Sequence, residues 1–234
     1  MFKTAIITGS STGIGKSLAF KLSKNKYKII LVARSEEKLE LIAKQIKDNG
    51  SESLIVPADL SKPESILQIK AKVKLFGDVS LVINNAGMGK FDKIEDVSLN
   101  DWNDQIDINL RSAFLVSQLF VPSMKIAKTG MLVFINSVAG KKAYPFSAAY
   151  SASKFGLKGL ADSFREELRA FNIKVISVFP GAVDTPFWND LNVDFPRNEM
   201  LNVDSLAESI LHTINAPGNL TVEEMVLRRT KGDF

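Results

Sequence analysis

The stretch TAIITGSSTGIG, residues 4–15, decides the fold of this 234-residue chain. Its first half is a short run of aliphatic and β-branched residues, as expected of a strand buried on both faces. Its second half contains Gly9, Gly13 and Gly15. Glycines permit a tight turn from a strand into a helix, and the N–H groups of a helix start can bind a diphosphate. The stretch therefore predicts a strand, a phosphate-binding turn and a helix.

Apolar runs of the same kind recur along the chain. They predict further strands at residues 28–33, 53–58, 80–85, 131–136, 174–179 and 223–228, with amphipathic helices at 14–23, 36–48, 64–76 and 151–170. Ser61 with Glu64, and Ser98 with Asp101, have the spacing of helix capping pairs. Strands that alternate with helices pair in parallel through right-handed crossovers. We therefore expect one α/β domain over residues 1–234, a doubly wound (Rossmann), mostly parallel seven-stranded sheet with helices on both faces.

The composition narrows the classes of function. With 45% hydrophobic and 24% charged residues the chain reads as a soluble globular protein. The absence of cysteine excludes disulfides and suits the cytoplasm, and neither a signal peptide nor a membrane span is predicted. The net charge of +4 comes with scattered lysines, which favours solvated helix faces over nucleic-acid binding. The single histidine, His212, is predicted on the surface, and no metal site is expected.

The end of the second strand indicates which dinucleotide the turn would bind. The glycine spacing is G-x-x-x-G-x-G, without the Gly-Lys-Ser/Thr of a nucleoside-triphosphate loop. Sites that select NAD usually carry an acid after the second strand, whereas an arginine accommodates the 2′-phosphate of NADP. Here Ala33 takes the place of the acid and is followed by Arg34 and Ser35. We therefore expect NADP(H), with an Arg34 that is merely exposed as the alternative.

The segment YSASK, residues 150–154, holds the candidate proton donor. Four residues on a helix bring Tyr150 and Lys154 to the same face. The pair alone is weak evidence, because an aromatic and a charge at this spacing also occur by chance. Ser137 follows the fifth strand, and Asn109 lies in a long helix with Asp107 nearby. Asn and Asp are poor choices for a helix interior, which indicates either a site or a kink.

Taken together, these segments resemble the short-chain dehydrogenase/reductases of the single-domain type. The motifs are TGSSTGIG, Asp59 in ADL, NNAG at 84–87, Asn109, Ser137, YSASK and PGAVDT at 180–185. The resemblance implies a catalytic set of Asn109, Ser137, Tyr150 and Lys154. It also implies an NADP(H) site made of Gly9, Ser11, Gly13, Ile14, Gly15, Arg34, Ser35, Asp59, Leu60, Asn85, Ala86, Gly87, Tyr150, Lys154, Pro180, Gly181, Val183 and Thr185.

The implied activity is hydride transfer between a nicotinamide and a small carbonyl or alcohol, with Tyr150 as proton donor. A Lys154 ammonium about 4 Å from the phenol would lower the pKa of Tyr150 by up to about three units. Ser137 would bind the substrate oxygen. Lys154 would also hold the nicotinamide ribose, and Asn109 would anchor a water that connects Lys154 to solvent.

Substrate choice is assigned to a lid at about 182–203, where Phe187 and Trp188 would contact the substrate together with Ser137 and Tyr150. PGAVDTPFW and the ending VEEMVLRRTKGDF are similar to bacterial sepiapterin reductases, which reduce a pteridine side-chain ketone. A 3-oxoacyl thioester reductase and a non-catalytic NADP(H)-binding sensor or scaffold stay as alternatives. The family resemblance implies a homotetramer or dimer packed through helices at about 101–124 and 150–171.

Overall fold

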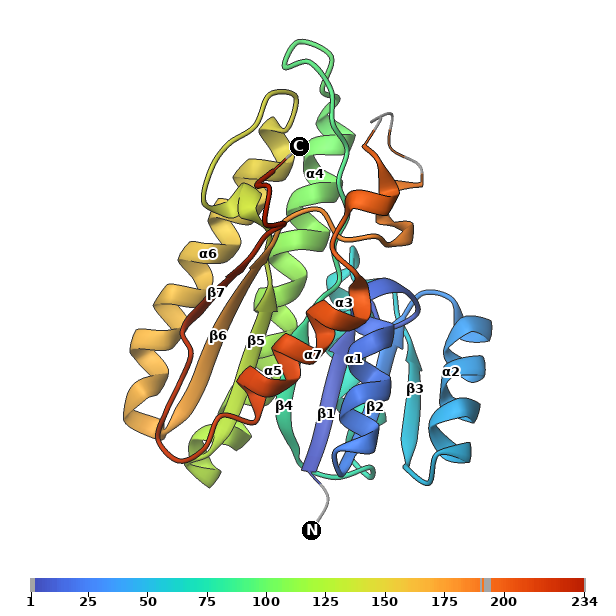
Figure 1. Ribbon diagram of the computed structural model, residues 1–234. Coiled ribbons are helices and arrows are strands. Elements are labelled where there is room, and N and C mark those ends of the chain that lie inside the picture. Colours follow the sequence, from blue (N-terminus) through green and yellow to red (C-terminus); the bar gives the residue numbers. More distant parts are fainter. Residues whose placement is uncertain (1–2, 190, 192–194, 234) are drawn as a thin grey trace.

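Seven strands form one sheet in the computed structural model, which describes residues 3–189, 191 and 195–233 (Figure 1). Its strands are β1 (Lys3–Thr8), β2 (Tyr27–Ala33), β3 (Ser53–Pro57), β4 (Val79–Asn84), β5 (Gly130–Ile135), β6 (Ile173–Pro180) and β7 (Glu224–Leu227). The spatial order is β3-β2-β1-β4-β5-β6-β7, and every neighbouring pair is parallel. The doubly wound parallel sheet predicted from the sequence is confirmed.

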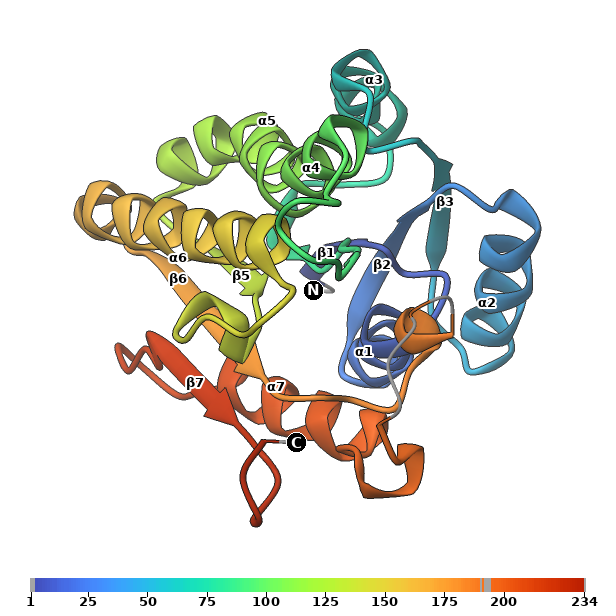
Figure 2. The same cartoon turned by 90° about the horizontal axis from the view of Figure 1, so that it is seen from above.

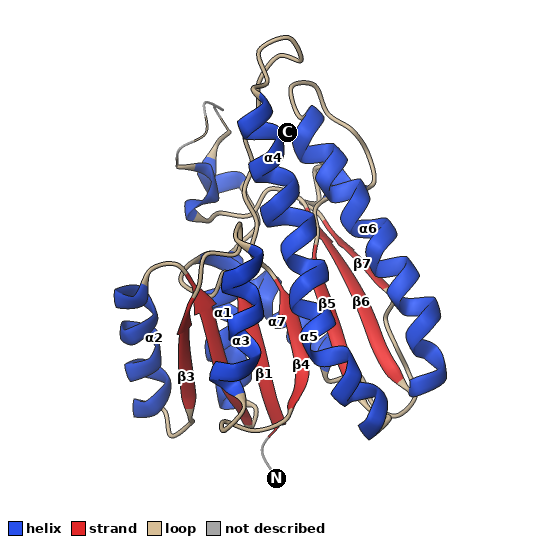
Figure 3. Ribbon diagram, turned by 180° about the vertical axis from the view of Figure 1, so that it is seen from behind, coloured by secondary structure: helices blue, strands red, loops and turns tan. Residues whose placement is uncertain are grey.

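Helices cover both faces of this sheet. They are α1 (Gly13–Lys24), α2 (Glu36–Asp48), α3 (Pro63–Val73), α4 (Leu99–Ile106), α5 (Ser112–Ala127), α6 (Ala148–Leu168) and α7 (Val203–Ile214). From behind, α3, α5 and α6 lie over one face (Figure 3), and the view from above shows α1, α2 and α7 on the other (Figure 2). Each layer encloses its own apolar core, one packed from α1, α2 and α7 and the other from α3, α5 and α6.

The strand order reverses direction at β1, which pairs with β2 on one side and β4 on the other. In open α/β sheets the loops beyond the carboxyl ends of the strands diverge at such a point and leave a crevice for a ligand. The segments that follow the strands β1 to β6 therefore meet at one edge of the sheet, and they carry the candidate site residues.

The two predicted capping pairs have different outcomes. Ser98 accepts a hydrogen bond from the Asp101 N–H at 3.0 Å and caps α4, as predicted. The prediction for Ser61 is wrong, because its hydroxyl donates to Asp59 Oδ1 at 2.8 Å instead. Helix α3 begins at Pro63, with Lys62 at its N-cap. Proline favours the first position of a helix, since it lacks the N–H that would be unpaired there.

The two edge strands depart from the prediction that all strands are buried on both faces. In β7, Glu224 and Val226 are exposed, and most of β3 is only half-buried. Each edge strand has a neighbouring strand on one side only and is therefore less enclosed than the inner strands. The inner strands β1, β4, β5 and β6 match the prediction along most of their length.

The predicted long helix of 101–124 is divided in two. A π-helical segment, Asp107–Arg111, joins α4 to α5 and contains Asn109. Such wide turns are uncommon inside helices and occur frequently at functional sites. The poor helix propensity of Asp107 and Asn109 therefore did mark an irregularity.

His212 is exposed, with Nε2 3.7 Å from Glu208 Oε1, so its predicted surface position is confirmed. No helix among the described residues is long and apolar enough to span a membrane.

Candidate active site

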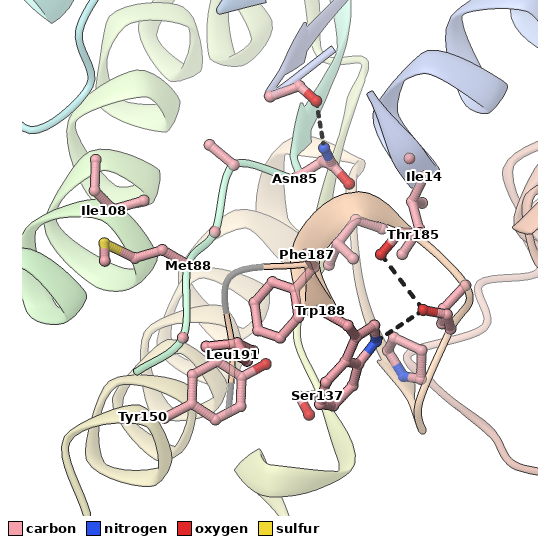
Figure 4. A pocket seen from close by; sticks show the side chains of 18 of the residues that line it. Ile14, Asn85, Met88, Ile108, Ser137, Tyr150, Thr185, Phe187, Trp188 and Leu191 are labelled. Carbon is pink, nitrogen blue, oxygen red and sulfur yellow. Dashed lines mark hydrogen bonds between the residues drawn. The ribbon is translucent and has the colours of Figure 1, made fainter. Parts of the chain in front are cut away.

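A cavity of about 1130 Å³ lies at the carboxyl edge of the sheet (Figure 4). It extends from the end of β2, past the glycine turn, to the start of α6. Most of the predicted site residues line it: Gly9, Ser11, Gly13, Ile14, Arg34, Ser35, Asp59, Leu60, Asn85, Ala86, Gly87, Ser137, Tyr150, Lys154, Pro180, Gly181, Val183, Thr185, Phe187 and Trp188. Gly15 and Asn109 are not among the lining residues. Parts of the predicted lid at 190 and 192–194 lie outside the described residues.

The glycine turn leaves no room for side chains. Gly9 has φ +62° and Gly13 has φ +54°, a left-handed region that favours glycine. A Cβ on Gly15 would lie 2.5 Å from the Gly9 carbonyl oxygen. A Cβ on Gly13 would lie 3.1 Å from Thr185 Cγ2, so the segment after β6 lies directly beside the turn. The turn and the start of α1 together form a cradle of backbone N–H groups.

Asn85 ties this turn to β4. Its Nδ2 donates to the Thr8 carbonyl at 2.9 Å and to the Gly9 carbonyl at 3.1 Å, and Figure 4 shows one of these two bonds. The Thr8 hydroxyl in turn accepts from the backbone N–H groups of Asn85 and Ala86, both at 3.0 Å. Thr8 was missed in the sequence, although a polar residue at the end of a buried apolar strand is a usable signal.

At the far end of the cavity, basic groups gather after β2. Arg34 is exposed there, and Lys38 of α2, which sequence reasoning missed, also lines the cavity. Ser35 accepts a hydrogen bond from the Lys38 N–H at 3.4 Å and caps α2. Burial opposes ionisation of Asp59, but hydrogen bonds from Ser61 and the charges of Lys62 and Arg34 hold its pKa below the ordinary value.

Tyr150, Lys154 and Ser137 meet at the other end. The Lys154 ammonium lies 5.7 Å from the centre of the Tyr150 ring and donates to the Ile135 carbonyl at 3.2 Å. The Ser137 side chain lies near enough to the Tyr150 phenol to act on the pKa of that phenol. Ser137 is held in turn by the Ala139 N–H, which donates to its Oγ at 3.1 Å.

The pKa values of Tyr150 and Lys154 differ from what the sequence predicts. Burial raises the pKa of Tyr150 to about 12, although the nearby Ser137 side chain acts in the opposite direction. Burial also lowers the pKa of Lys154 to about 8. The predicted lowering of the Tyr150 pKa by Lys154 is therefore wrong for the protein alone, because desolvation of the phenolate is the larger effect. Tyr150 keeps its proton at neutral pH.

Asn109 lies behind the cavity wall, with 1% of its surface exposed. Its Oδ1 accepts from the Met88 N–H at 2.8 Å, and its Nδ2 donates to the Met88 carbonyl and the Ser153 hydroxyl, both at 2.9 Å. Both hydrogens of the Asn109 amide are thus donated to groups of the protein itself. A Cβ on Gly87 would lie 3.3 Å from Asn109 Oδ1 and 3.6 Å from Lys154 Nζ, so these two groups approach one spot behind Gly87.

Aromatic side chains surround Tyr150. Phe187 and Trp188 lie in the turn Pro186–Trp188, and Phe187 lies 6.0 Å from the Tyr150 ring between ring centres (Figure 4). Phe91, which follows β4 and was missed in the sequence, lies 5.4 Å from the same ring. No periodic pattern marks Phe91, so only the fold reveals its place.

The C-terminal segment also reaches the cavity. Arg229 and Asp233 are lining residues, and Asp233 accepts a hydrogen bond from the Tyr144 hydroxyl. Arg229 pairs with Glu199 at 2.7 Å and so connects this segment to the one after β6. Within the described residues, no group of three or more His, Asp or Glu side chains has an arrangement that could hold a metal ion.

Comparison with known proteins agrees with this geometry. A family model described as short chain dehydrogenase matches residues 3–195. An uncharacterised oxidoreductase of Staphylococcus epidermidis is 31% identical over 97% of this chain and 96% of its own. A sepiapterin reductase of Chlorobaculum tepidum is 30% identical over 98% of this chain and 97% of its own.

A solved structure shares the whole fold. The alcohol dehydrogenase of the archaeon Thermococcus sibiricus, complexed with 5-hydroxy-NADP, superposes with a TM-score of 0.91 at 31% identity. The match covers 98% of this chain and 97% of that one.

Proposed function

Because the chain belongs to the short-chain dehydrogenase family, we propose that this oxidoreductase uses NADP(H) to interconvert a small carbonyl compound and its alcohol. One observation carries the proposal: Ser137 and Tyr150 line the same end of a large cavity, and the Lys154 ammonium lies 5.7 Å from the centre of the phenol ring. Hydride transfer to a carbonyl needs a proton donor next to the oxygen that receives charge. The hydroxyl pair is suited to that purpose.

The cavity fits a dinucleotide. A side chain at Gly9, Gly13 or Gly15 would crowd against neighbouring atoms. Such a turn is expected where a phosphate must approach the backbone N–H groups closely. Arg34 and Lys38 would hold the 2′-phosphate at the far end, and no acid replaces Ala33 there. The NADP analogue bound by the Thermococcus sibiricus relative supports the same choice.

When bound, the nicotinamide supplies or accepts the hydride. The Ser137 hydroxyl, which is held by the Ala139 N–H, would bind the substrate oxygen and stabilise its charge. Tyr150, whose pKa of about 12 keeps it protonated, would pass its proton to that oxygen. Lys154 would stabilise the phenolate left behind, and Asn109 would keep the Met88 backbone in place beside the site.

The segment 182–203 is proposed as the substrate lid, and the helices α4 and α6 are considered for contacts between subunits. Exposed apolar side chains on these helices and on α5, among them Trp102, Phe114 and Phe155, support the proposal that the protein assembles as a homo-oligomer. Leu115, Leu119, Leu160 and Phe164 lie on the same helices but pack partly against the core.

A pteridine side-chain ketone is the second candidate substrate. The Chlorobaculum tepidum relative favours it, and the aromatic surroundings of Tyr150 suit a planar molecule. A panel of ketones that includes sepiapterin, followed at the nicotinamide absorbance, separates the candidates. If the protein binds NADPH tightly but reduces none of these carbonyl compounds, the result would favour the alternative of a non-catalytic NADP(H)-binding sensor or scaffold.

The Tyr150→Phe variant tests the proposed chemistry. Loss of the proton donor should lower kcat by about 100-fold or more, since general acids contribute about 10²–10⁴. The affinity for NADPH, measured by nicotinamide fluorescence, should change by less than about threefold, because the ring stays in place. Unchanged turnover in this variant would refute the role of Tyr150.

A further inference from the structure

Four aromatic rings, including that of the candidate proton donor Tyr150, form a continuous surface. This aromatic wall consists of Phe91, Tyr150, Phe187 and Trp188, all of which line the cavity. Between ring centres, Phe91 lies 5.4 Å from Tyr150 and Phe187 lies 5.1 Å from Trp188, both edge to face. Phe91 and Trp188 close the arrangement at 6.4 Å with an interplanar angle of 20°. The rings come from three segments, so only the folded chain assembles the wall.

The wall is held in a fixed arrangement. Trp188 Nε1 donates to the Val183 carbonyl at 2.9 Å, which sets the orientation of the indole (Figure 4). A Cβ on Gly89 would lie 2.6 Å from Phe187 Cζ and 3.2 Å from Phe91 Cζ, so two of the rings pack onto bare backbone. All four side chains are nevertheless only half-buried, and therefore keep surface that a ligand can cover.

Three of the charged side chains that line the cavity near the wall already have partners. Lys90 forms an ion pair with Asp101, and Arg229 forms one with Glu199. Asp233 accepts from the Tyr144 hydroxyl. A charged substrate would have to compete with these contacts, whereas an uncharged ring could lie against the aromatic wall without displacing them.

We propose that the aromatic wall is a subsite for an uncharged aromatic ring of the substrate, so that the enzyme prefers aryl-bearing carbonyl compounds over saturated ones of equal size. The inference rests on the proposed function. The hydrogens at the edge of an aryl ring carry partial positive charge and interact favourably with the faces of neighbouring rings. A saturated ring buries similar apolar area but lacks this interaction, and it is thicker.

Two ketones isolate the effect of the ring. In 4-phenylbutan-2-one and 4-cyclohexylbutan-2-one the carbonyl is equally far from the ring and conjugated in neither, so intrinsic reactivity is matched. With NADPH, kcat/KM should be about 3- to 10-fold higher for the phenyl ketone, in keeping with the usual strength of an aromatic pair. A ratio near one or below would overturn the proposal.

Variants locate the preference. Trp188→Leu and Phe91→Leu should each bring the ratio towards one, chiefly by lowering kcat/KM for the phenyl ketone. Phe155→Leu is the matched control, because Phe155 lies on α6 with Tyr150, is 45% exposed and does not line the cavity. A ratio that persists in both wall variants would also overturn the proposal.

A binding measurement keeps this test apart from that of the proposed function. The chain has two tryptophans, so Trp102→Phe leaves Trp188 as the only fluorophore of its kind. Its emission is followed while either ketone is added with saturating NADP⁺, a pair that cannot react. Tighter binding of the phenyl ketone without turnover would support the subsite and refute the proposed function. If both ketones are reduced and bind with equal affinity, the proposed function is supported and the subsite is refuted. If neither ketone shows saturable binding, the subsite is also refuted.

Discussion

Asn136 joins the two elements that carry the candidate catalytic residues. Its Nδ2 donates to the Lys154 carbonyl at 3.1 Å, while its Oδ1 accepts from the Ser137 N–H at 2.9 Å. The side chain is buried, and a Cβ on Gly140 would lie 2.5 Å from its Oδ1. One amide therefore sets the distance between the end of β5, where Ser137 stands, and the helix of Tyr150 and Lys154.

Removal of this link should impair turnover more than binding. In Asn136→Ala we expect kcat to fall by about 10- to 100-fold, since small displacements of reacting groups are costly. The affinity for NADPH should stay within about threefold, because the glycine turn and Arg34 are untouched. Stopped-flow turnover and nicotinamide fluorescence measure the two quantities.

Asn84→Ala is the control for this prediction. Asn84 is equally buried at the end of the neighbouring strand β4, but its Nδ2 donates to Ser117, away from the cavity. Both variants should lower the Tm by a similar amount, and only Asn136→Ala should lower kcat. Equal losses of kcat would mean that Asn136 has a structural role alone.

The pH dependence of reduction should follow Lys154. Its pKa is lowered to about 8 by burial, whereas that of Tyr150 is raised to about 12. As the pH rises above about 8, the ammonium that stabilises the phenolate is lost while Tyr150 still holds its proton. Because kcat/KM reports ionisations of the free enzyme, it should be level below pH 8 and fall above it. A level profile up to pH 10 would contradict this assignment.

The stability of the fold should rise with pH as Lys154 loses its proton, whereas kcat/KM should fall. A lysine with a folded-state pKa of about 8, below its ordinary 10.5, makes the folded protein less stable at every pH below 8. That penalty, about 3 kcal/mol at most, disappears as the pH rises from 8 to 10.5. Lys154→Met should therefore raise the free energy of unfolding at pH 7 by about 1–2 kcal/mol, after the lost hydrogen bond to Ile135 is deducted.

Urea unfolding of the two proteins without cofactor measures this difference. The gain in the variant should shrink as the pH increases from 8 towards 10, because the wild type then no longer carries the buried charge. A variant that is less stable than the wild type at pH 7 would show that the ammonium is better solvated than its burial implies.

Cofactor selection should depend on the basic pair at the end of β2. Replacing both Arg34 and Lys38 by alanine removes the charges proposed to bind the 2′-phosphate, and we expect KM for NADPH to rise about 10- to 100-fold. The KM for NADH, which lacks this phosphate, should change little. Lys44→Ala, an exposed change on the same helix that is outside the cavity, should alter neither value. Equal rises for both coenzymes would argue against a phosphate contact.

Local sequence determined the course of the chain and the region of the site. Apolar runs and turn residues act over a few positions, so seven strands and the glycine turn after β1 were predictable within one or two residues. The helix irregularity at Asn109 was also visible, because Asp and Asn disfavour a helix interior. The prediction that Ser61 caps a helix was wrong because its hydroxyl donates to a nearby acceptor, Asp59, instead.

Only the tertiary structure decided how the site residues behave. The pKa values of Tyr150 and Lys154 depend on burial by segments distant in sequence, and this burial outweighs the attraction expected from a spacing of four residues. The link through Asn136 and the position of Phe91 against Tyr150 likewise require strands and loops that meet at one edge of the sheet. Sequence spacing orders neighbours along one element, whereas desolvation and contact between elements arise only when the chain is packed.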